Sequence, residues 1–352
     1  MRLTALFSMS LLMLPALPLI VSSQTIRPVR DNVGFCWDAA QMDRLISYLE
    51  KNEGNTPVAS GLIGGISPHD DFLYAGRVYI PLYRALRAKE VVIFGVTHGT
   101  VRKEIGDTKN VLILDSFEKW KGPYADVPIS PLREYIRSRT DTSQVVVSNK
   151  AHELEHSIEA TVPFLQHYNR GVIITPIMVT AMPLERMEQL SEKVAGILAQ
   201  YIQEKKYVLG KDIFILISSD ANHYGKDFSN VPFGEDADAH EQGIEHDSAI
   251  AQNDLAGAMD SRKVSSLTRD LWGPTYADQG NVVWCGKYSI PFGLLVLQKA
   301  AQKVLHRNVT GTVLRYSDTY TEGVLPLKQT GMGTTAPFSL KHWVGFVAVG
   351  YK

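Results

Sequence analysis

Hydrophobic and polar positions follow one another along this chain with two different periods. Short apolar runs bounded by polar residues predict strands at 61–68, 90–96, 111–114, 144–147, 172–179, 212–218, 310–318 and 343–351. Apolar residues three or four positions apart predict helices at 38–50, 76–88, 132–138, 152–168, 184–205, 236–253 and 289–304. Because strands alternate with helices, we predict an α/β fold in a single domain, with a mostly parallel central sheet flanked by helices.

Three of the predicted strands, 61–68, 90–96 and 212–218, are each followed closely by a histidine. If these strands are parallel neighbours, their carboxyl ends lie at one edge of the sheet, where open α/β sheets bind ligands. We therefore predict that three histidines converge there: His69, His98 and His223. Four others lie in no such setting and are predicted to be surface or core residues: His167, His240, His306 and His342.

Two further segments carry reactive side chains. Cys285 lies just before the apolar helix predicted from Ser289, and a thiol near a helix N-terminus tends towards the thiolate that a nucleophile or metal ligand requires. The alternative is an inert buried cysteine. The segment 155–159, Glu-His-Ser-Ile-Glu, lies near the start of a predicted helix. It could supply a ligand, a proton-transfer pair or an orienting neighbour, or simply form a charged helix N-terminus.

Taken together, five segments resemble the Memo-like family, also called AmmeMemoRadiSam system protein B. They are SPHDDFLYAG, VVIFGVTH, EHSIEATVPFLQ, ISSDANHYG and WCGKYSIPFGLL, and they occur in the family's order across most of the core at 61–298. The resemblance implies a fold like that of class III extradiol dioxygenases, which hold non-haem iron with two histidines and a glutamate. Memo-like proteins keep two histidines and have a cysteine in place of the carboxylate.

The resemblance implies a role for each matching residue of this chain. The implied metal ligands are His69, His98 and Cys285. The residues implied to act beside the metal are His223, as a proton donor or acceptor, His156, as part of the pocket lining, and Asp220, as a supporting group. Asp247 also matches a family position, but no role for it follows from the sequence.

This chain departs from the family pattern in three places. Two acids, Asp70 and Asp71, follow the first histidine where the family has a small, glycine-containing sequence. An apolar leader precedes the domain, whereas most of the family is cytoplasmic. A Gly/Thr/Pro-rich stretch at 319–342 predicts a long loop that covers the site or is mobile. Each departure bears on the identity of the substrate more than on the fold.

Two imidazoles and a thiolate suit copper(I), iron(II) or zinc, and three protein ligands leave coordination positions open. We therefore predict one metal ion, copper or iron with zinc possible, in a metal-dependent oxidoreductase. A metal-bound thiolate excludes a Cys36–Cys285 disulfide, so we expect that bridge to be absent.

Two alternatives to an oxidoreductase remain: a non-catalytic protein that binds a peptide or small anionic ligand in the same pocket, and a hydrolase. The hydrolase would use the metal, or Ser218 or Ser219 as nucleophile, although no G-x-S-x-G motif surrounds them.

Composition narrows the partners. The 352 residues are 45% hydrophobic and 21% charged, which is typical of a globular protein, and the net charge is −1. A near-neutral charge argues against nucleic acid or an anionic membrane as the main partner, so we expect a small-molecule or peptide ligand.

The N-terminus predicts export. Residues 1–23 combine one positive charge, a long apolar run and small residues at its end, which is the pattern of a signal peptide. We therefore predict a mature domain at 24–352 in the periplasm or outside the cell, with no stable membrane embedding after cleavage. The alternative is an uncleaved leader that anchors the protein in the membrane.

Overall fold

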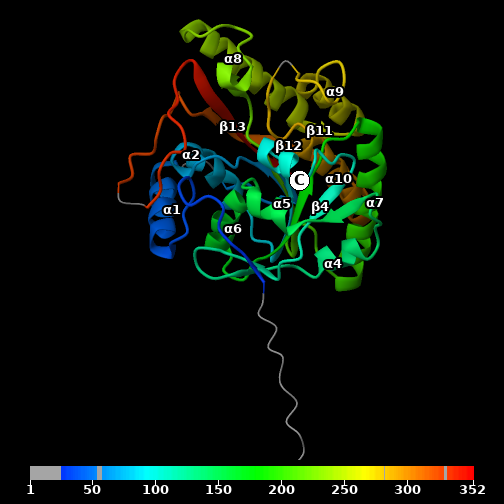
Figure 1. The fold of residues 1–352 in the computed structure, drawn as a ribbon. Coiled ribbons are helices and arrows are strands. Elements are labelled where there is room, and N and C mark those ends of the chain that lie inside the picture. The colour runs from blue at the N-terminus through cyan, green and yellow to red at the C-terminus, as the bar shows by residue number, and fades with distance from the viewer. Residues whose placement is uncertain (1–24, 54–57, 281, 329–330) are drawn as a thin grey trace, which may run out of the picture.

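The computed structural model describes residues 25–53, 58–280, 282–328 and 331–352. The predicted α/β domain is confirmed: a large central sheet is flanked by helices (Figure 1). The predicted signal peptide, 1–23, falls outside the described residues. Within the described part of the chain, no helix combines the length and apolar character needed to cross a membrane.

The central sheet has ten strands, nine of which follow the order β11-β12-β13-β2-β9-β3-β8-β4-β7, while β10 pairs with β13. The sheet is mixed. Its middle strands, β2, β9, β3 and β8, are parallel to one another, and β4 is parallel to β7, whereas β4 pairs antiparallel with β8 and the C-terminal strands also pair antiparallel. The bounds are β2 (Gly64–Ser67), β3 (Glu90–Gly95), β4 (Leu112–Leu114), β7 (Val145–Val147), β8 (Ile173–Val179), β9 (Ile213–Ser218), β10 (His223–Gly225), β11 (Gly257–Met259), β12 (Val309–Asp318) and β13 (His342–Tyr351).

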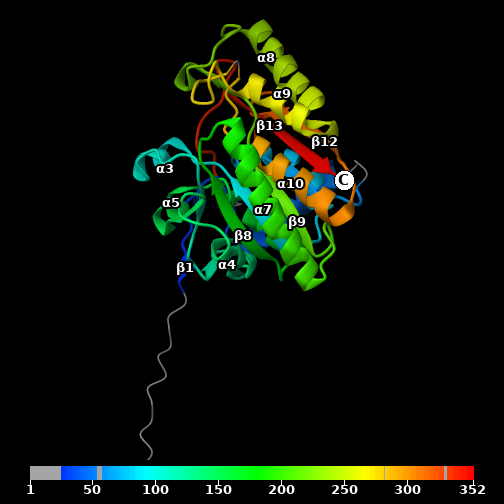
Figure 2. The same cartoon turned by 90° about the vertical axis from the view of Figure 1, so that its right-hand side faces the viewer.

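The sheet separates two hydrophobic cores because successive residues of its strands point to opposite faces. In β3, for example, Val92 and Phe94 belong to one core and Val91 and Ile93 to the other. Helices α7 and α10 lie side by side over the first face (Figure 2), while α1, α2 and α6 cover the second (Figure 1).

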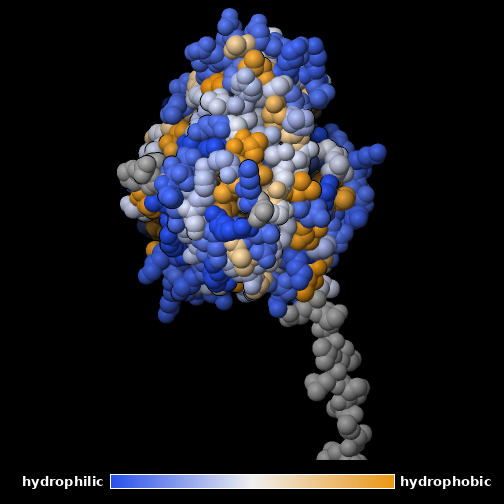
Figure 3. Space-filling model, turned by 90° about the vertical axis from the view of Figure 1, so that its left-hand side faces the viewer, coloured by the Kyte–Doolittle hydropathy of each residue, from blue (hydrophilic) through white to orange (hydrophobic). Residues whose placement is uncertain are grey.

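The helices have the following bounds: α1 (Ala39–Glu53), α2 (Phe72–Tyr83), α3 (Gly99–Glu104), α4 (Leu132–Arg137), α5 (Asn149–Leu154), α6 (Val162–Tyr168), α7 (Leu184–Lys205), α8 (Ala237–Ile250), α9 (Ser261–Leu271) and α10 (Ser289–Leu305). Figure 3 shows one face of the molecule, on which hydrophilic side chains dominate and apolar side chains form small groups, as expected for a surface in contact with water.

Several elements differ from the prediction, and the short helix α3 and strands β10 and β11 are among those not predicted. Helix α2 begins at Phe72, four residues early, because the amides of Tyr74 and Ala75 already donate to the Asp71 carbonyl. The helix expected at 152–168 is wrong as one piece: it is divided into α5, a short 3₁₀ turn at 159–161, and α6. Helix α9 was not predicted, although its apolar positions have helical spacing.

The break between α5 and α6 is braced by a buried arginine. Strand β1 (Ile26–Arg27) joins β5 (Lys119–Trp120) and β6 (Val127–Pro128) in a small separate sheet. From β1, the Arg27 guanidinium donates to the carbonyls of His152 and Glu155 and pairs with the Glu159 carboxylate at 2.5 Å. Arg27, on the small sheet, therefore holds the non-helical segment 155–158 in place.

Candidate metal centre

The three histidines predicted to converge follow strands that are neighbours in the sheet. Strand β9 pairs in parallel with β2 on one side and with β3 on the other, so the predicted arrangement of these strands is confirmed. His69 lies two residues after β2, and His98 lies at the start of α3, beyond β3. Their ring centroids are 5.2 Å apart. His223, five residues beyond β9, lines one cavity together with His69 and His98.

Cys285 joins this group from a turn that precedes α10. One ligand atom each from His69, His98 and Cys285 lies within 4.8 Å of the other two. The Cys285 Sγ is 3.3 Å from His69 Nε2. A tetrahedral ion with ordinary metal–sulfur and metal–nitrogen bonds would require about 3.6 Å between these atoms. The donor types and their spacing therefore fit a metal ion.

The hydrogen bonds of His69 fix which ring nitrogen is free. The Ser218 hydroxyl donates to the Ser157 carbonyl at 2.7 Å, so its oxygen accepts from His69 Nδ1 at 2.8 Å. Burial, together with the neighbouring His98 and His156, lowers the pKa of His69, so the ring is neutral near pH 7. With the proton on Nδ1, the Nε2 lone pair faces Cys285 and is available to a metal.

His98 is oriented by a carboxylate in the same way. Its Nδ1 lies 2.7 Å from Glu155 Oε1, and its backbone amide donates to Glu155 Oε2. Burial alone would lower the pKa of His98, but the Glu155 carboxylate raises it above its usual value. Because Glu155 also accepts from the amides of His156 and Ser157, these bonds compete with helix formation and explain the break after α5.

The two other histidines of the site are neutral near pH 7. His156 stacks on His98 with ring centroids 4.6 Å apart, and burial lowers its pKa to about 4. Burial likewise lowers the pKa of His223 to about 4, and its Nδ1 lies 3.1 Å from the Ala221 carbonyl. Donation to that carbonyl leaves the Nε2 of His223 free to accept a proton.

The predicted supporting acid, Asp220, lies directly against His69. Its Oδ1 accepts from the His69 amide at 2.8 Å, and its Oδ2 is 3.3 Å from His69 Nε2. Asp220, His223 and Cys285 also form a second group whose ligand atoms lie within 4.8 Å. Burial raises the pKa of Asp220. Burial and the negative charge of Asp220 also raise the pKa of the neighbouring Asp70.

The two acids that follow His69, Asp70 and Asp71, have different hydrogen-bond partners. Asp70 lines the cavity beside His69. Asp71 lines the same cavity, and its carboxylate also accepts from the amide and hydroxyl of Thr335, at 2.5 and 3.0 Å, in the loop between β12 and β13. Asp71 therefore anchors the predicted loop against the start of α2, and Thr335 lines the same cavity as Asp70.

The expectation that Cys285 is biased towards thiolate is wrong as far as the protein groups around it are concerned. Cys285 lies four residues before α10, and burial, followed by the charge of Asp220, raises its pKa well above the usual value. Its Sγ nevertheless accepts from the Asp220 amide at 3.1 Å. The next residue must be glycine, because a Cβ on Gly286 would lie 2.1 Å from the Ser219 hydroxyl oxygen.

A family model described as "Memo-like protein" matches residues 37–324, which is most of the chain. This chain belongs to the Memo-like family. Curated relatives include a MEMO1 family protein of Pyrococcus furiosus, 26% identical over 57% of this chain, and one of Aquifex aeolicus, 31% identical over 53%. A third, from Pyrobaculum arsenaticum, is 29% identical over 46%. The aligned part of the chain spans only 66%, 63% and 53% of these Memo-like relatives, respectively.

The structure gives a role to Asp247, on α8, for which none followed from the sequence. Its carboxylate accepts from Trp284 Nε1 at 2.5 Å, the Tyr316 hydroxyl at 2.7 Å and the Asn222 amide at 3.2 Å. Asn222 and Trp284 form an antiparallel bridge that joins the segment carrying His223 to the turn carrying Cys285. Asp247 therefore fixes these two segments of the site relative to each other.

Replacing Asp247 with asparagine is expected to flatten the pH dependence of stability. Burial raises the pKa of Asp247 to about 7, above the value of about 3.9 in unfolded chains. Between these values the folded protein holds a proton that the unfolded protein lacks, so the free energy of unfolding falls as pH rises from about 4 to about 7. Asp247→Asn removes this contribution, as urea unfolding across that range would show.

The control is Asp238→Asn, which is exposed on the same helix and should keep the wild-type slope of the free energy of unfolding against pH. Equal slopes for wild type and Asp247→Asn would contradict a raised pKa at Asp247.

Sequence reasoning missed the part that Ser218 plays, since a serine at a strand end has no distinctive signal. Ser218 and Ser219 are fully buried, and both hydroxyls donate to main-chain carbonyls. Neither is free to attack a substrate, so this geometry disfavours a serine hydrolase. The four histidines predicted to lie outside the centre contribute to none of the three clusters of possible metal ligands found among the described residues.

Proposed function

We propose that this protein binds one transition-metal ion, copper or iron, and acts as an oxidoreductase on a small-molecule or peptide ligand. The observation that carries the proposal is the cluster of His69, His98 and Cys285, with both imidazole Nδ1 atoms already committed to protein oxygens. The remaining donors, two imidazole nitrogens and a sulfur, suit copper(I) or iron(II), with zinc as the alternative. Three protein ligands leave positions open for a substrate.

The ion, when bound, would supply electron transfer and the positive charge that converts Cys285 to thiolate. The protein contributes the fixed donors around it. The Asp220 amide donates to Cys285 Sγ and stabilises negative charge on it, and Ser218 and Glu155 hold the two imidazoles. His223 is the group best placed to take a proton from a substrate, at Nε2, because its ring is neutral near pH 7.

Elemental analysis of protein purified without a histidine tag tests this proposal. We expect about one copper or iron per chain, as three protein ligands around one ion require. The loaded protein should consume oxygen faster than the metal-free protein with ascorbate as reductant, and His223→Gln should slow this reaction while keeping the metal. Recovery of zinc alone, or of no metal, would exclude the oxidoreductase.

Export forms the second part of the proposal, and it rests on the leader at 1–23. In an oxidising compartment the metal would have to keep Cys285 from pairing with Cys36. Both cysteines are free thiols here, and Cys36 is buried in the core that contains α1.

A further inference from the structure

Two cavities border the candidate metal centre and share His98, His223 and Phe228 in their walls. The first, which we call the Cys285 cavity, has a volume of about 370 Å³ and contains Cys285 in its wall. The second, the His69 cavity, has a volume of about 540 Å³ and contains His69. Both volumes fall in the range of about 300–1,000 Å³ that is usual for small-molecule sites.

The two cavities differ in charge. Among the described residues of its wall, the His69 cavity has four aspartates and one arginine or lysine, which is Arg30. Arg102 and Lys287 line the Cys285 cavity, and the described residues of its wall include neither aspartate nor glutamate. An anion is therefore favoured in the Cys285 cavity and disfavoured in the other.

The two cations of the Cys285 cavity are held by backbone oxygens and not by carboxylates. Arg102 Nη1 donates to the Thr97 carbonyl and Lys287 Nζ to the Asp278 carbonyl, each at 2.9 Å. The Asp278 carboxylate itself accepts from the amide and hydroxyl of Thr275, at 3.0 and 2.9 Å. Within the described structure, neither cation has a carboxylate oxygen within ion-pair distance, and Lys287 Nζ lies 5.2 Å from the centre of the Tyr288 ring. Both cations can therefore still form an ion pair with a ligand.

The positive charge of Arg102 affects the protonation of Lys287. Burial, followed by the positive charge of Arg102, lowers the pKa of Lys287. Two like charges that face one cavity repel each other, and an anion bound between them would relieve that repulsion. The repulsion adds to the geometric argument that the cavity is built for a negative group.

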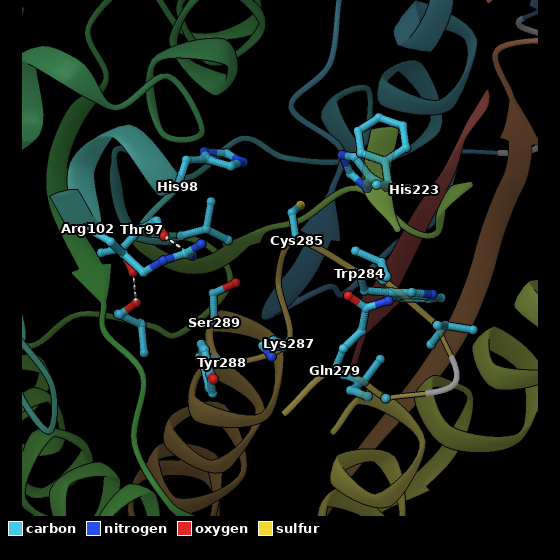
Figure 4. A pocket seen from close by; sticks show the side chains of 18 residues that line it. Thr97, His98, Arg102, His223, Gln279, Trp284, Cys285, Lys287, Tyr288 and Ser289 are labelled. Atoms are coloured by element: carbon cyan, nitrogen blue, oxygen red, sulfur yellow. Dashed lines mark hydrogen bonds between the residues drawn. The ribbon is translucent and has the colours of Figure 1, made fainter. Parts of the chain in front are cut away.

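The rest of the Cys285 cavity is largely apolar. Its wall includes the side chains of Val96, Leu271, Val282, Trp284 and Tyr288. Figure 4 shows Cys285 between His98 and His223 at one end of the cavity, with Lys287 and Tyr288 towards the other end. A ligand held by its charge at Lys287 could therefore extend along an apolar wall to the candidate metal ligands.

We propose that Arg102 and Lys287 form a subsite for the carboxylate of a small organic substrate with an apolar body, whose other end faces Cys285. The assignment of the bound molecule as a substrate rests on the proposed oxidoreductase function, whereas the anion subsite stands on the cavity alone. Arginine and lysine side chains bind carboxylates through charge-assisted hydrogen bonds, which are stronger than neutral ones.

Benzoate is the probe for this subsite, and benzamide is its neutral control. Calorimetric titration of metal-free protein at low ionic strength should show benzoate binding more tightly than benzamide. Lys287→Met and Arg102→Met should each weaken benzoate binding roughly 10-fold or more, because a hydrogen bond to a charged group is lost. Arg30→Met, in the wall of the His69 cavity, should leave the affinity for benzoate unchanged. Lys287→Arg, which keeps the positive charge, should retain most of the affinity that Lys287→Met loses.

The outcomes separate this inference from the proposed function. If benzoate binds no better than benzamide, or equally well to Lys287→Met and wild type, the subsite is wrong even where the metal content is full. Tighter binding of inorganic phosphate than of benzoate would overturn the assignment to a carboxylate. If benzoate binding survives in protein that takes up no copper or iron, the subsite holds and the oxidoreductase fails. Thermal unfolding of each variant shows whether a loss of binding reflects a loss of folding.

Discussion

Replacing Cys285 with alanine is expected to remove nearly all copper or iron from the purified protein. The substitution deletes the sulfur that lies 3.3 Å from His69 Nε2 and leaves two imidazoles as the proposed donors. Losing a partner that only orients a metal ligand costs about 10–100-fold in affinity, so losing a ligand should cost at least the upper part of that range. Elemental analysis of tag-free protein measures this effect directly.

The matched control is Cys36→Ala, which removes the other thiol of the chain from the buried core and should keep the full metal content. His69→Ala and His98→Ala should behave like Cys285→Ala, while His167→Ala should behave like wild type. Asp220→Asn tests the second cluster, in which Asp220 joins His223 and Cys285. Unchanged metal content in Cys285→Ala would contradict the proposed centre, and metal loss in Asp220→Asn but not in His98→Ala would move the centre to the second cluster.

Replacing Gly286 with alanine is expected to destabilise the protein and abolish metal binding together. The added Cβ would lie 2.1 Å from the Ser219 oxygen and 2.3 Å from the Ser219 Cβ, so the turn that carries Cys285 must shift. Overpacking of this kind costs about 1–3 kcal/mol in the free energy of unfolding. Urea unfolding and elemental analysis of the same preparation measure the two effects.

A second substitution tests whether the effect of Gly286→Ala comes from the clash with Ser219 or from adding a methyl group to the chain. Gly286→Ala combined with Ser219→Gly removes both clashing atoms and should recover part of the stability and of the metal content. Gly196→Ala is the control for an added methyl group, because a Cβ there meets no atom within 4 Å on helix α7. It should be neutral or slightly stabilising, by about 0.5–1 kcal/mol. A Gly286→Ala variant that binds metal like wild type would show that the close contact with Ser219 does not position Cys285.

The structure also shows what the two acids after His69 contact. Asp71 holds Thr335, and with it the loop between β12 and β13, against the start of α2. Asp70 remains beside His69 in a cavity rich in acids. Both acids therefore line the same cavity, and Asp71 also anchors the loop.

Periodicity alone was enough to predict the strands that organise the site. Strands β2, β3 and β9 are short apolar runs that end at polar residues, and strands that alternate with helices pair in parallel, although the position of β9 between β2 and β3 was not predicted. The convergence of His69, His98 and His223 could therefore be predicted without a structure. The same patterns failed at 155–158, because side-chain bonds from Glu155 to nearby amides override helical spacing there.

The sequence by itself determined the α/β fold, the sheet edge that carries the site and the residue types that gather there, since these depend on local periodicity and on the position of polar residues at strand ends. Only the tertiary structure decided which nitrogen of His69 and His98 is free, because Ser218 and Glu155 lie far from them along the chain. It also decided that Arg102 and Lys287 share one cavity, because that meeting depends on packing between segments 185 residues apart.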